Sequence, residues 1–156
     1  MPMFRNLFFI ACLLLVSSLN AHDVYVKEVA QSTKTLYPKV LKALADNMLI
    51  VVSEIDILGK FEHAGLPKRF GKNFNTNNLE AIKAIIVCNG YFGNEVANSD
   101  PEMMALCPLR ITIIQQNGKS KILFARPSAL SKGSKANAIL KKLEERVIFA
   151  LESSAK

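Results

Sequence analysis

Two cysteines, Cys88 and Cys107, are the residues of this chain whose chemistry stands out. Each lies where a β-branched apolar run meets the polar stretch that joins the two runs. A redox or ligand-carrying thiol pair needs proximity and one thiol of lowered pKa, whereas an oxidising compartment favours a structural disulfide. The chain has no Cys-x-x-Cys motif. Three interpretations therefore stay open: a disulfide, two unpaired core cysteines, or a functional thiol pair.

Histidine and carboxylate side chains are the other candidates for chemistry. His63 could bind a metal together with a cysteine, but the four-ligand spacing of a zinc site is missing. Glu54 and Asp56 share one face of a predicted strand, because side chains alternate with a period of two, yet no nucleophile is paired with them. The chain also lacks a Gly-x-Ser-x-Gly motif and a phosphate-binding glycine loop. These residues predict no metal site, no cofactor and no catalytic residue, which favours a non-enzymatic protein.

The N-terminus has the three-part pattern of a secretory signal. Arg5 supplies a basic start, residues 7–16 are an unbroken apolar run, and small residues lead to Ala21. The run is too short for a membrane span, which needs about 20 apolar residues. We therefore expect residues 1–21 to be a cleaved signal peptide and residues 22–156 to form a single α+β domain. That domain would be periplasmic or secreted, with no stable membrane span after cleavage.

The net charge of the chain limits the class of partner. The charge is +7, and it falls to +6 when Arg5 leaves with the signal peptide. A positive protein meets anions at a raised rate. Basic domains often bind nucleic acid, but an exported protein does not meet it. We therefore expect no nucleic acid partner and favour a small-molecule or anionic envelope ligand.

Hydrophobic periodicity predicts the elements that would position these residues. Predicted strands cover 24–29, 49–57, 79–87, 109–115 and 120–125, and predicted helices cover 35–48 and 134–151. The strand at 49–57 begins apolar on both sides, which indicates that one of its ends is central in the sheet. Glu144 falls on the polar side of the final helix. The order β-α-β-β-β-β-α predicts an α+β two-layer sandwich, with a mostly antiparallel sheet and helices on one face.

Two connecting segments are expected to be irregular. Residues 58–78 are basic and broken by glycines and a proline, with one or two helical turns near 60–64, and residues 89–107 form a long loop. The strands before and after 89–107 should be antiparallel neighbours, which would bring Cys88 and Cys107 close enough for a disulfide. The loop contains apolar residues such as Tyr91 and Phe92. They could line a pocket, bury a dimer interface or pack on the core.

Several short motifs occur in an order that is typical of one family. They are Val52-Ser53-Glu54-Ile55-Asp56, Ala64-Gly65-Leu66, Cys88-Asn89-Gly90, Asp100-Pro101, Pro108-Leu109 and Arg126-Pro127. In this order the sequence resembles the bacterial domain-of-unknown-function family 302, over residues 24–151. The resemblance implies a TATA-binding-protein-like β-α-β4-α fold and a homodimer, and it implies no established activity. The chain departs from the family at Gly90, where proline is usual, and at Arg126, where an acid is usual.

We expect the binding site between the helix-free face or edge of the sheet, the basic segment 58–78 and the loop 89–107. The candidate ligand-binding residues are Cys88, Asn89, Tyr91, Phe92, Cys107, His63 and Arg126. The leading hypothesis is a small, exported, non-enzymatic binding domain of the cell envelope. The alternatives are a thiol redox or sulfur-handling protein that uses Cys88 and Cys107, and a purely structural dimeric module.

Overall fold

The computed structural model describes residues 23–156, so the expected signal peptide and its cleavage site lie outside the described residues. Five strands form one sheet in the order β1-β5-β4-β3-β2, and every neighbouring pair is antiparallel. The strands are β1 (Val24–Val29), β2 (Ile50–Asp56), β3 (Ala81–Cys88), β4 (Leu109–Gln116) and β5 (Lys119–Ala125). An Asn-Gly hairpin joins β4 to β5, with Asn117 and Gly118 both at positive φ.

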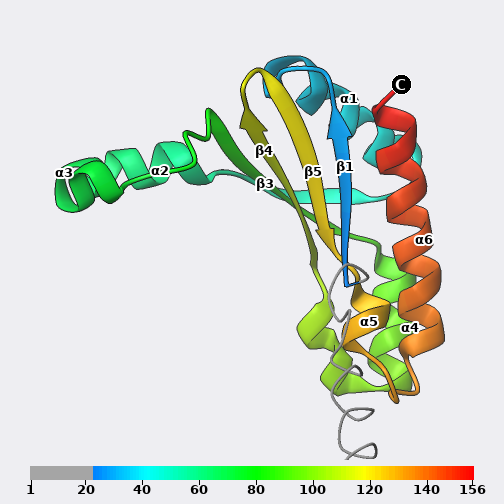
Figure 1. Ribbon diagram of the computed structural model, residues 1–156. Coiled ribbons are helices and arrows are strands. Elements are labelled where there is room, and N and C mark those ends of the chain that lie inside the picture. Colours follow the sequence, from blue (N-terminus) through cyan, green and yellow to red (C-terminus); the bar gives the residue numbers. More distant parts are fainter. Residues whose placement is uncertain (1–22) are drawn as a thin grey trace, which may run out of the picture.

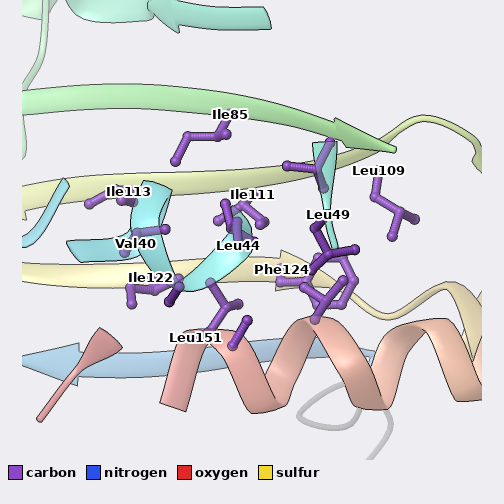
Figure 2. Close-up of a cluster of buried hydrophobic side chains, with 14 of the residues drawn as sticks. Val40, Leu44, Leu49, Ile85, Leu109, Ile111, Ile113, Ile122, Phe124 and Leu151 are labelled. Carbon is purple, nitrogen blue, oxygen red and sulfur yellow. The ribbon is translucent and has the colours of Figure 1, made fainter. Parts of the chain in front are cut away.

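Two long helices cover one face of this sheet. They are α1 (Thr33–Asp46), which connects the two edge strands β1 and β2, and α6 (Asn137–Ser154) near the C-terminus (Figure 1). Figure 2 shows their apolar side chains, such as Val40 and Leu151, against buried residues of the sheet such as Ile113. The predicted α+β two-layer architecture is therefore confirmed.

No long helix lies along the opposite face of the sheet within residues 23–156 (Figure 1), and we call it the helix-free face. Burial alternates along β4 and β5: Ile111, Ile113 and Phe124 are buried under the helices, and the residues between them are more exposed. On β1 the side chains of Val24 and Val26 are 44% and 55% exposed. Residues whose side chains point away from the helices therefore form a partly apolar outer face.

The segment between Cys88 and Cys107 was expected to be a loop, and this prediction is wrong. It contains the α-helix α4 (Gly90–Ser99) and the 3-10 helix η2 (Pro101–Leu106). The Asn89 side-chain oxygen accepts a hydrogen bond from the backbone N–H of Phe92 at 3.1 Å and so caps the first turn. Burial of Phe92 and Val96 then anchors one side of the helix.

The basic segment after β2 is also more ordered than predicted. It forms α2 (Ile57–His63), α3 (Leu66–Phe70) and the 3-10 helix η1 (Gly71–Asn73). Asp56 caps α2 by accepting from the Gly59 N–H at 3.1 Å, and Gly65 adopts a left-handed φ of 75° between the two helices. We call residues 57–79 the arm, because Figure 1 shows α2 and α3 projecting away from the sheet.

Two further sequence predictions need correction. Strand β2 is an edge strand and not central: among residues 23–156 it pairs only with β3, through a register shift between Val51 and Ser53. Its apolar residues Ile50 and Val52 are 65% and 59% exposed. Glu144 was placed on the solvent side of α6 but is only 2% exposed. Its carboxylate accepts hydrogen bonds from residues around the short helix α5 (Pro127–Leu130), which the sequence did not predict.

Candidate binding site

The two cysteines lie at the junction of β3 with α4. Pairing of Val87 with Leu109 in the β3–β4 ladder confirms that these strands are antiparallel neighbours, and it brings Cys88 to the side of residues 107–108. Both side chains are free thiols of intermediate burial. Burial raises the pKa of the Cys107 thiol, and the nearby Cys88 raises that pKa further. No bridge joins the cysteines here, and a disulfide in the oxidised protein stays a prediction.

Three other candidate residues lie beside the cysteines, and two of them hold the fold together. Asn89 is buried, and besides capping α4 it donates from Nδ2 to the Met48 carbonyl at 2.9 Å. Phe92 is 7% exposed and belongs to the core, with the Arg146 guanidinium 5.3 Å from its ring centroid. Tyr91 is 69% exposed and meets Phe92 edge-on at a centroid distance of 5.7 Å. Of these three side chains, only Tyr91 is open to a ligand.

Arg126 and His63 lie elsewhere. Arg126 follows β5, and its Nε donates to the buried Glu144 carboxylate at 2.8 Å. The same carboxylate accepts from the Ser128 N–H at 3.0 Å and from its hydroxyl at 2.5 Å. His63 is the last residue of α2 on the arm and is exposed. The arm and α4 lie at opposite ends of the sheet (Figure 1), so the structure does not bring His63 to the cysteines.

A groove of about 430 Å³ lies on the helix-free face, where the outer sides of β1, β4 and β5 meet the η2 segment and α5. Its walls are mostly apolar and include Val24, Leu106, Leu123 and Leu130. Arg110 supplies its cationic group, and this side chain is exposed. Within residues 23–156, Arg110 forms no ion pair. The groove therefore offers an apolar surface together with one positive charge.

A second hollow, of about 390 Å³, lies where the arm meets the sheet. It is lined by apolar side chains from the arm, among them Leu58, Phe61 and Phe70, and by Ile82 of β3. The residues that follow η1, including Asn75 and Thr76, complete its rim. The two hollows share no lining residue, so the arm and the groove are separate surfaces.

A family model for a domain of unknown function, DUF302, matches residues 25–154 of this chain. The chain belongs to the DUF302 family. A crystal structure of an uncharacterized conserved DUF302 protein from Bacillus stearothermophilus has a similar fold, with a TM-score of 0.75 and 19% sequence identity. The match covers 87% of this chain and 100% of that one. No curated protein matches the sequence.

Within residues 23–156, no group of three or more His, Cys, Asp or Glu side chains is arranged to hold a metal ion. No helix in the same residues is both long and apolar enough to cross a membrane.

Sequence reasoning missed the lining of the groove in this DUF302 domain. The alternation along β4 and β5 does mark Arg110, Thr112 and Leu123 as residues of one face. What the sequence could not supply is the strand order, which places β1 beside β5 and brings Val24 to the same surface. It also did not reveal that η2 would close one end of the groove.

Proposed function

We propose that this DUF302 chain is an exported, non-enzymatic envelope protein that binds a small molecule with an apolar body and one anionic group. The observation that carries the proposal is the groove on the helix-free face, with Arg110 among its apolar walls. The signal-like residues 1–21 support export. The excess of positive charge in the chain favours an anionic ligand.

The dimensions and chemistry of the groove support a small ligand. Ligand sites are hollows of about 300–1,000 Å³ with apolar walls and a few polar groups that fix orientation. The groove, at about 430 Å³, falls within this range. Arg110 can form two parallel hydrogen bonds to a carboxylate or phosphate, and Thr112 adds a hydroxyl on the same side of β4.

The test uses two fluorescent probes with the same aromatic ring system, of which only one carries a negative charge. Anilinonaphthalene sulfonate has an apolar ring system and a sulfonate, and N-phenylnaphthylamine is its neutral counterpart. We expect both to bind in the groove, and we expect Arg110→Gln to weaken binding of the sulfonate about tenfold, at the low end of a hydrogen bond to a charged group. Binding of the neutral probe should change less than about twofold, because it has no anion for the arginine.

Two matched variants control this test. Lys119→Gln removes an equal charge from the far end of β5, outside the groove, and should leave both affinities unchanged. Leu123→Trp fills the groove and should weaken both probes together. Equal loss of sulfonate binding in Arg110→Gln and Lys119→Gln would show that only overall charge matters. Unchanged binding in Leu123→Trp would place the probes elsewhere.

Self-association through the β2 edge is the second candidate, and the exposure of Ile50 and Val52 favours it. An exposed edge strand with apolar side chains is a template for pairing with another chain. A homodimer formed there would leave the groove on the outer face open. A structural dimeric module and a ligand-binding domain are therefore compatible in one protein.

The thiol redox alternative receives less support. An attacking thiol in redox chemistry has a lowered pKa, because the thiolate is the nucleophile. Burial acts in the opposite direction on the pKa of Cys107. A role for Cys107 in packing, or in a disulfide with Cys88, fits this direction better.

A further inference from the structure

The arm carries a concentrated positive charge. Residues 57–79 contain Lys60, Lys68, Arg69 and Lys72 against a single carboxylate, Glu62, and all five side chains are exposed. None of the four cations takes part in an ion pair within residues 23–156. The charge of the arm is therefore available to an external anion.

Exposed aromatic rings lie among these cations. Phe61 is 42% exposed and Phe70 is 50% exposed, although both also line the hollow at the base of the arm. The Arg69 guanidinium lies 5.8 Å from the centroid of the Phe70 ring. A cation and an apolar ring are thus held together on the outermost helix, α3.

The position of the arm makes this surface accessible. Strands β2 and β3 are antiparallel neighbours, and a hairpin connection between such strands needs only about 2–5 residues. The chain instead inserts α2, α3 and η1 there, and Figure 1 shows them extending away from both layers of the sandwich. The arm is therefore an addition that closing the sheet does not require, placed where a large flat partner can reach it.

We propose that the arm docks this protein onto an anionic lipid bilayer. Such a surface satisfies both features at once: the lysines and Arg69 meet headgroup phosphates, and Phe61 and Phe70 enter the boundary about 5–10 Å into the bilayer. An acidic polysaccharide would neutralise the charge but would leave the rings in water. The proposal rests on the arm alone and not on the groove, so each can fail without the other.

The chain contains no tryptophan, so Phe70→Trp places a unique fluorophore on α3. The full chain is expressed, and its N-terminus is determined by mass spectrometry. We expect vesicles of phosphatidylcholine with about 30% phosphatidylglycerol to shift the Trp emission to the blue, and brominated acyl chains to quench it. Vesicles of phosphatidylcholine alone should do neither. Raising the salt concentration from about 0.05 to 0.5 M should weaken the binding.

Charge variants locate the docking element. Lys68→Gln with Arg69→Gln should weaken vesicle co-sedimentation about 25-fold, since each basic residue near an anionic surface is worth about fivefold. The matched control, Lys141→Gln with Lys142→Gln, removes an equal charge from the exposed side of α6 and should change binding less than about twofold. Phe61→Ser should also weaken binding, with the charge unchanged. Circular dichroism of each variant establishes that it is folded.

Three results would overturn the proposal. The first is no binding of the unaltered protein to the phosphatidylglycerol vesicles. The second is binding with unchanged emission of the Phe70→Trp protein, or equal losses in the two charge variants, because docking would then not use the arm. The third is vesicle binding that is unchanged by Phe61→Ser, together with equally strong binding to a soluble polyanion such as heparin. That outcome would identify an acidic macromolecule as the partner.

Discussion

Glu144 on α6 is the most informative single position for a stability test. Its carboxylate is 2% exposed and accepts hydrogen bonds from Arg126 at 2.8 Å and from the N–H and hydroxyl of Ser128 at 3.0 and 2.5 Å. Glu144→Ala would leave all three donors without this acceptor. The change therefore tests whether the contact between the end of β5, α5 and α6 holds the two layers together.

The expected cost follows from the exposure of the partners. Breaking a buried ion pair by removing one member costs about 3–5 kcal/mol. The Arg126 side chain is 37% exposed, so water can solvate part of its charge after the substitution. We therefore expect a loss of about 3 kcal/mol, at the low end of that range. Ser128→Ala removes only the hydroxyl donor and should cost about 1 kcal/mol.

Urea unfolding followed by circular dichroism measures these free energies, provided that the slope with denaturant stays constant. The matched control is Glu145→Ala, one residue along the same helix, where the side chain is exposed. It should change stability by less than about 0.5 kcal/mol. If Glu144→Ala and Glu145→Ala have equal effects, the carboxylate does not support the fold and the reasoning fails.

Three other expectations concern the cysteines, the sheet edge and the acid range. In protein purified without reductant, Cys88 and Cys107 should resist alkylation. Reduction should lower the free energy of unfolding by about 3 kcal/mol, because it opens the loop between them. Two rapidly alkylated thiols in the native protein would refute the bridge. Light scattering should show that Val52→Glu converts the proposed dimer to a monomer, while Val26→Glu, at an exposed site on the other edge strand, does not. A dimer in both variants would exclude the β2 edge as the dimer interface. Hydrogen bonds from Lys27 and Tyr25 lower the pKa of Glu152, so its stabilising effect should be complete above the unfolded pKa, about 4.3, and be lost as the pH falls through the folded value. Glu152→Gln should flatten that acid-side decline, and an unchanged pH profile of the unfolding midpoint would contradict this.

Local patterns were sufficient for the strands and for the two covering helices. Alternation marked β4 and β5, and the Asn117-Gly118 turn fixed their pairing, because each signal lies within a few residues. Helix α4 was missed because Gly90 and Gly93 weaken helix propensity. Its N-terminus is marked by a local signal, the Asn89 cap, but its stability also needs the burial of Phe92, which depends on the tertiary structure.

Positions set by distant residues were beyond sequence reasoning. Glu144 looks solvent-facing by helical periodicity, and only the return of residues 126–128 to α6 buries it. The edge position of β2 depends on strand order, which its own residues do not encode. The same limit applied to the candidate site: Cys88 and Cys107 were correctly expected to lie near each other, whereas the groove needed strand order and the position of η2.

The pairing of the first strand with the last has a consequence for the time at which this protein can fold. In the part of the chain that the structure describes, strand β1 pairs only with β5, with Val24 opposite Ala125. A chain that emerges from its N-terminus must therefore be almost fully synthesised before the sheet can close, and contacts so distant in sequence form slowly. Until then β1 has no strand to pair with, although α1 can already pack against β2 and β4. A chain with this delay keeps its first strand unpaired for most of its synthesis, so β1 is the strand most exposed to pairing with another chain before the sheet is complete.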